Sequence, residues 1–131
     1  LLAGSEAQDA LLLRLAIAAH RLATPDATRW RQMYEARLHA AERDGDSTHQ
    51  REQAMYLLEV RHDAAGALEY ARRNWSAQRE PADVRIYARA AARAHSAADC
   101  AQLAHWLADT RYEDRTLSID SSCGLLSRGP S

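Results

Sequence analysis

The sequence predicts an all-α fold, a right-handed array of about three antiparallel helical hairpins. Three observations favour it. Alanine is abundant and aromatic residues make up only 6% of the chain, which suits helices that pack closely together. Apolar residues recur at helical spacing in six segments. Breaks of about two to five residues separate most of these segments, and such short connections force successive helices to run antiparallel.

The six helices are expected in chain order over residues 6–22, 27–43, 48–61, 64–79, 83–95 and 98–110. Ser5 and Gln8 form a capping-box pattern at the start of the first helix, and Asp26 is expected to cap the second. Pro81 ends the fourth helix and suits the first turn of the fifth, where a missing backbone N–H costs little.

The first helix is apolar around most of its circumference. Its apolar residues are Leu11, Leu12, Leu13, Leu15, Ala16, Ile17, Ala18, Ala19 and Leu22. Such a helix is expected to need neighbours on two sides. The second helix is expected to bury Trp30, Leu38 and either Met33 or Tyr34, because these positions share one helical face.

Charge is nearly balanced along the chain. Arginine supplies all 17 positive charges, which oppose 18 acidic residues and leave a net charge of −1. This balance argues against a dedicated nucleic-acid or membrane-surface binder. No apolar run approaches the ~18 residues of a membrane span. The chain is therefore expected to be soluble, in the cytoplasm, or in the periplasm if a signal peptide has been removed.

The chemistry-bearing residues form no recognisable catalytic set. The chain lacks a Gly-x-Ser-x-Gly sequence, a glycine-rich phosphate loop and a Cys-x-x-Cys pair. Its six histidines include no pair at the His-x3-His spacing that would place two ligands on one helix face. We expect no enzyme activity, no cofactor and no metal site. Cys100 and Cys123 either pair in an oxidising compartment or stay free in the cytosol, and the sequence leaves both open.

A weak internal repeat runs through the chain. Residues 25–30, 63–68 and 97–102 each follow a helix break, at offsets close to the ~34-residue period of tetratricopeptide repeats. The middle unit carries a turn, small residues early in the next helix and a late proline at His62, Asp63, Ala67, Ala71 and Pro81. This stretch resembles the second half of a tetratricopeptide repeat, and alanine- and arginine-rich usage without lysine is typical of a bacterial coding sequence. Met55 departs from the family, which has a small residue there, and Pro81 comes two residues late.

The resemblance implies that the first helices of the hairpins line a concave groove that binds a protein or peptide. The family's groove positions fall on His49, Glu52, Tyr56 and Glu59, and in the next unit on Asp83, Ile86, Ala90 and Arg93. Tyr56 is expected to pack a partner's side chain, with Glu52 and Glu59 pairing a basic group. The alternative is a solvated helix face with a half-buried tyrosine. The family's clamp of lysine and asparagine for a peptide's C-terminus is absent, because the chain has no lysine.

We therefore predict a repeat domain over residues 1–113, followed by a Ser/Gly-rich tail over residues 114–131. The predicted function is a protein- or peptide-interaction scaffold without nucleic-acid binding. The rival hypothesis is a structural or oligomerisation module, such as a homodimer, with no groove ligand. A metal-binding protein or an enzyme is the less favoured alternative. The apolar tail residues are expected to dock on an exposed hairpin face, and they are Leu117, Ile119, Leu125 and Leu126.

Overall fold

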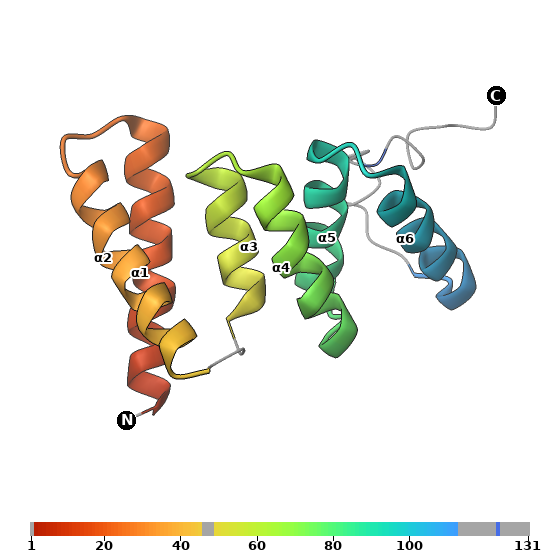
Figure 1. The fold of residues 1–131 in the computed structure, drawn as a ribbon, viewed down its shortest axis with the longest axis horizontal. Helices are drawn as coiled ribbons and strands as arrows, with labels where there is room; N and C mark the ends of the chain where they lie inside the picture. The colour runs from red at the N-terminus through yellow and green to blue at the C-terminus, as the bar shows by residue number, and fades with distance from the viewer. Residues whose placement is uncertain (1, 46–48, 113–122, 124–131) are drawn as a thin grey trace.

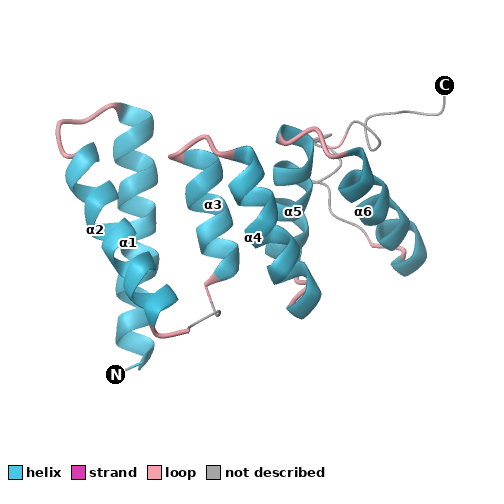
Figure 2. Ribbon diagram, viewed as in Figure 1, coloured by secondary structure: helices cyan, strands magenta, loops and turns pink. Residues whose placement is uncertain are grey.

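The computed structural model describes residues 2–45, 49–112 and 123 of the chain, with side chains from Gln8 onward. All regular secondary structure in these residues is helical (Figure 2). In chain order the helices are α1 (Leu2–Leu22), α2 (Ala27–Arg43), α3 (Gln50–Glu59), α4 (Ala64–Ala77), α5 (Pro81–Arg93) and α6 (Ala97–Thr110). The predicted all-α fold is confirmed. None of these helices is both long enough and apolar enough to cross a bilayer.

The helices form three hairpins that stand in a row, α1 with α2, α3 with α4 and α5 with α6 (Figure 1). The two helices of each hairpin run antiparallel because a connection of a few residues reverses the chain. The first helices also touch one another, since α3 packs against both α1 and α5. In addition α4 packs along α5, so the second and third hairpins share a broad interface.

Short polar side chains cap the N-termini of two of the helices. The Asp63 carboxylate accepts a hydrogen bond from the Gly66 N–H at 2.9 Å at the start of α4. Ser96 Oγ accepts one from the Asp99 N–H at 3.3 Å at the start of α6. Each bond satisfies an N–H that has no partner inside its own helix. Pro81 lies in the first turn of α5, as its position in the sequence predicts.

Several predicted helix ends were wrong. The helix α1 begins at Leu2 and continues through Ser5, so Ser5 does not lie at its start, and the Ser5 side chain is outside the described set. Asp26 precedes α2 as expected, but its side chain makes no capping hydrogen bond. The helix α4 stops at Ala77 because Gln78 turns to an extended conformation, with φ −139° and ψ 138°.

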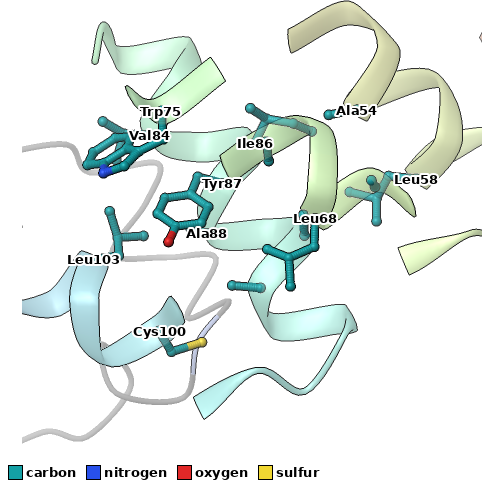
Figure 3. Packing of buried hydrophobic residues seen from close by; sticks show 14 of the residues in the cluster. Ala54, Leu58, Leu68, Trp75, Val84, Ile86, Tyr87, Ala88, Cys100 and Leu103 are labelled. Atoms are coloured by element: carbon teal, nitrogen blue, oxygen red, sulfur yellow. The ribbon is translucent and has the colours of Figure 1, made fainter. Parts of the chain in front are cut away.

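Two apolar clusters form the core. The larger joins α3, α4, α5 and α6, and Figure 3 shows Trp75, Tyr87 and Leu103 within it. The smaller joins α1, α2 and α3 through Leu12, Leu13, Ala16, Tyr34, Tyr56 and Val60. Tyr34 is buried while Met33 is 44% exposed, which decides between the two candidates for the inward face of α2.

Met55 packs against both clusters. A long, flexible thioether side chain fills an irregular gap well. Met55 therefore connects the core of the first hairpin to the core of the other two.

The turn after the first helix of every hairpin has the same backbone conformation. Ala23, His62 and His95 have φ values of 53°, 53° and 55°, in the left-handed region. The next residue in each turn then donates its N–H to a carbonyl in the last turns of the preceding helix. A side chain with a Cβ adopts this conformation at a cost of roughly 1 kcal/mol. The three hairpins therefore share one conformation after their first helices, which Arg111 after α6 also adopts.

We predict that Ala23→Gly raises the free energy of unfolding by about 1 kcal/mol, because glycine carries no Cβ penalty in the left-handed region. The control is Ala18→Gly, at an exposed position inside α1, which should lower it by about 1 kcal/mol because glycine is a poor helix former. Urea denaturation followed by circular dichroism measures both. Destabilisation by both substitutions would contradict the assigned turn.

A buried aspartate ties α5 to the helices before it. Asp83 has no exposed surface. Its carboxylate accepts hydrogen bonds from Asn74 Nδ2 at 2.7 Å, from Arg51 Nη1 at 3.0 Å and from the Glu80 backbone N–H at 2.8 Å. A buried carboxylate is tolerated only when its charge and lone pairs are matched in this way. Asp83 therefore links α3 and α4 to the first turn of α5.

A second buried aspartate, Asp99, ties α6 to the helices before it. Asp99 accepts hydrogen bonds from Arg72 Nη2 and the Tyr87 hydroxyl, both at 2.6 Å, and from Ser96 Oγ. The Arg72 guanidinium, helped by Ser96 and Tyr87, holds the pKa of Asp99 well below its usual range, although burial acts in the opposite direction. Asp99 therefore joins α4 and α5 to the first turn of α6.

We predict that Asp99 makes stability depend on acid pH. Because the pKa of Asp99 is lower in the folded chain than in the unfolded one, its stabilising contribution is present above about pH 4 and is lost as the pH falls further. Asp99→Asn should flatten the decline in unfolding free energy below about pH 4, while reducing stability at neutral pH. Urea titrations across this range test it. Asp109→Asn, an exposed change on the same helix, should keep the wild-type slope, and equal slopes in all three proteins would contradict the prediction.

Cys100 and Cys123 are joined in a disulfide. The Cys123 sulfur also lies 3.4 Å from the Ala88 carbonyl oxygen. Of the two states that the sequence leaves open, the structure contains the paired one. The bond attaches residue 123 to α6 beside α5. The rest of the predicted tail, including Leu117, Ile119, Leu125 and Leu126, lies outside the described residues.

Candidate functional site

A cleft of about 240 Å³ lies between the first and second hairpins. Its walls come from α1, α2, the start of α3 and the residue that follows α4. The lining residues are Asp9, Ala10, Tyr34, Arg37, Leu38, Ala41, His49, Arg51, Glu52 and Gln78. Two of the predicted groove residues, His49 and Glu52, are therefore part of a real concave surface.

Tyr34 is the buried aromatic residue of this cleft. Its side chain is only 2% exposed, and its ring lies 4.8 Å from the Tyr56 ring, centroid to centroid. Burial raises the pKa of the Tyr34 phenol, and the charges of Glu52 and Asp9 raise it further. The phenol therefore stays protonated at neutral pH, close to two carboxylates.

Charged residues of both signs surround Tyr34. On one wall Arg37 Nη1 lies 3.5 Å from Asp9 Oδ1, and Arg37 Nη2 donates to Gln8 Oε1 at 3.2 Å. On the other wall Arg51 Nη2 lies 3.8 Å from Glu52 Oε1, while Arg51 Nη1 is bound to the buried Asp83. Arg51 is thus held by the core network, and Glu52 is the more exposed member of its pair.

Asp9 carries the least satisfied polar atom of the cleft. Its Oδ1 is buried and accepts no hydrogen bond among the described residues, although Arg37 approaches it at ion-pair distance. An acceptor in this state loses hydration without full compensation. Asp9 therefore contributes a negative charge to this wall of the cleft, opposite the Arg37 guanidinium.

Tyr56 does not lie on an accessible surface. It is 1% exposed, and its hydroxyl donates a hydrogen bond to Glu35 on α2. Burial, followed by this bond, raises the pKa of the Tyr56 phenol. The expected packing of Tyr56 against a partner's side chain does not fit this position, because the side chain already fills the core between α1, α2 and α3.

Glu59 also forms interactions that hold the helices together. Its side chain is 10% exposed, and it forms ion pairs with Arg21 of α1 at 2.8 Å and with Arg89 of α5. One carboxylate thus connects the first helices of all three hairpins. Its partners come from within the chain and leave little of the carboxylate open to a basic group of a partner protein.

The predicted positions of the third hairpin separate into two kinds. Ile86, Asp83 and Ala90 are buried, so they contribute to packing and do not face solvent. Arg93 is exposed, and its Nη1 lies 3.5 Å from the Leu58 carbonyl oxygen. It borders a shallower hollow with His62 and His95. The six predicted groove residues therefore do not form one continuous surface.

The sequence did not single out Asp9, Arg37 or Gln78 as site residues. They come from three different helices or their ends, and no local spacing connects them. Tyr34 was considered only as a core residue, which it is, and its position at the base of the cleft depends on how the first two hairpins pack. The side chains that line the cleft could bind a ligand through hydrogen bonds and charge. Among the described residues, no group of three His, Cys, Asp or Glu side chains could hold a metal ion.

No family model, curated protein or solved structure matches this chain. The functional argument therefore depends on the geometry of the chain itself.

We predict that substitutions at the expected groove residues differ in their effect on the free energy of unfolding. Tyr56→Ala should lower the free energy of unfolding by about 3–5 kcal/mol, as expected for loss of a buried aromatic side chain. Glu52→Ala, at the partly exposed wall of the cleft, should change it by no more than about 0.5 kcal/mol. Chemical denaturation of both variants provides the comparison. A small effect of Tyr56→Ala would show that Tyr56 is not a core residue.

Proposed function

We propose that this chain is a protein- or peptide-interaction scaffold, built as a tetratricopeptide-like array, and that the cleft between its first two hairpins is the binding site. Three hairpins in a row, with first helices in mutual contact, support this proposal. So does the recurrence of one turn conformation after α1, α3 and α5. Arrays of this kind typically use extended concave surfaces for binding.

The cleft is the single observation that carries the proposal. It brings His49 and Glu52 together with Asp9 and Tyr34, and its apolar lining comes from Ala10, Leu38 and Ala41. A mixture of apolar surface with a few polar groups at fixed positions is typical of recognition sites. The size of the cleft suits one or two side chains of a bound segment, so the partner would present a short peptide stretch.

The disulfide indicates the kind of compartment. Disulfides persist in oxidising environments and are rare in the cytosol. The Cys100–Cys123 bond therefore favours the periplasm, or another extracytoplasmic space, among the locations that the sequence allows.

A random peptide library displayed on phage tests the proposal, because it samples many candidate ligands at once. The library is selected against the wild-type chain, and the enriched peptides are synthesised and titrated by fluorescence anisotropy. We expect Glu52→Gln and Asp9→Asn each to weaken binding by about fivefold or more, in line with loss of a hydrogen bond to a charged group. Circular dichroism confirms that each variant is folded.

The matched control is Asp109→Asn, which removes the same charge from an exposed position on α6. It should leave peptide affinity unchanged. The proposal fails if no peptide is enriched above background, or if Glu52→Gln and Asp109→Asn bind the selected peptide equally well.

The rival function is self-association, and one observation favours it. Leu11, Leu22 and Met33 are 56%, 75% and 44% exposed, all on the first hairpin. The two leucines stay exposed although α1 already packs against α2 and α3. Sedimentation velocity over a wide concentration range tests it. A dimer that Leu11→Gln and Leu22→Gln dissociate would support an oligomerisation module, and a monomer at all concentrations would rule it out.

A further inference from the structure

Two histidines from different hairpins meet at the surface. His20, in the last turn of α1, and His62, in the turn after α3, are 42 residues apart in the sequence. Their Nε2 atoms lie 3.1 Å apart, and their ring centroids are 5.2 Å apart. His62 is exposed and His20 is partly exposed, so solvent reaches the pair.

The separation of the two nitrogens suits a shared metal ion. Histidine nitrogens bind Zn²⁺ at about 2.0–2.1 Å, so two that share one ion are about 2.9 Å apart at a right angle and about 3.3 Å apart at the tetrahedral angle. The observed 3.1 Å lies between these values. Both rings would have to rotate, so that their lone pairs point to one site beside the pair instead of along the line between the two nitrogens.

The chemistry of the pair agrees with this geometry. Neutral imidazole is a preferred ligand of Cu²⁺, Ni²⁺ and Zn²⁺. In the pair as it stands, one Nε2 carries a hydrogen and donates to the other. Binding an ion through both Nε2 atoms requires that hydrogen to move to Nδ1 of the same ring. When both rings are neutral, this is a change of tautomer with no net loss of a proton from the pair.

The neighbouring cations are already paired. Arg21, next to His20, forms an ion pair with Glu59 at 2.8 Å. Arg61, next to His62, lies 3.8 Å from Glu35. An acidic partner therefore opposes the positive charge of each of these arginines, which reduces the repulsion that a bound metal ion would meet.

We propose that His20 and His62 form a binding site for a divalent transition-metal ion that prefers imidazole, with water in the remaining coordination positions. The described residues offer no third protein ligand, so the site is open. The ion would bridge the first hairpin to the second at the end opposite the start of α1. Because it links two hairpins in the folded state only, it stabilises their packing by linkage.

Isothermal titration calorimetry of tag-free protein with NiCl₂, CuCl₂ and ZnCl₂ tests the proposal. We expect saturable binding of one ion per chain, tightest for Cu²⁺ as the Irving–Williams order requires. His20→Gln and His62→Asn should each weaken binding at least about tenfold, because a single imidazole remains. Asparagine tolerates the left-handed backbone of residue 62, so the second variant keeps the turn.

The controls are His39→Gln and His105→Gln, which remove exposed histidines of α2 and α6 and should leave binding unchanged. A second readout is thermal unfolding. Added metal should raise Tm in the wild type and in the controls, reversibly with a chelator, and not in the His20 and His62 variants. Selective broadening of the His20 and His62 ring signals by Cu²⁺ in NMR spectra would identify the ligands directly.

Three outcomes would overturn the proposal. The first is no saturable binding by the wild type. The second is equal binding by the wild type and His20→Gln, which would place the ion elsewhere. The third is a metal-induced rise in Tm that persists in His62→Asn. In each case the pair would serve only as a hydrogen bond between hairpins.

Discussion

The array depends on buried carboxylates that each bind side chains from more than one helix. Asp83, Asp99 and Glu59 together connect α1, α3, α4, α5 and α6. Each carboxylate has lost most of its water, so it is tolerated only when its partners are correctly placed. A shift of one helix along another would leave a buried charge unpaired. These interactions therefore determine how the hairpins are aligned, whereas the alanine-rich surfaces between the helices could slide.

The same interactions hold two of the residues that were expected to line a groove. Glu59 is occupied by Arg21 and Arg89, and Tyr56 by the core and by Glu35. A position that faces a ligand in one helical array can face a neighbouring helix in another, because the spacing and tilt of the hairpins differ. Here one accessible concavity lies at the junction of two hairpins. Its polar groups come from α1, α2 and the start of α3.

The boundary between the first and second hairpins carries different side chains at its two ends. The cleft, near the start of α3, contains carboxylates, arginines and a buried tyrosine. The other end contains the His20–His62 pair, which bridges the turn regions without an ion pair of its own. The boundary between these hairpins is less extensive than the boundary between the second and third, where α4 packs along α5. It is the natural place for a bound ligand to affect the packing of the array.

The sequence alone determined the helices and their order. Helical spacing of apolar residues and the position of Pro81 in the first turn of α5 are local features, and each acts within a few residues. The ends of α3 and α5 were placed too late, because the left-handed residues His62 and His95 that follow them carry no glycine as a signal. The tertiary structure decided the rest, including the burial of Tyr56, the pairing of Cys100 with Cys123, the cleft and the histidine pair. These depend on residues tens of positions apart, whose proximity is set by side-chain packing between helices and cannot be derived from the period of any one of them.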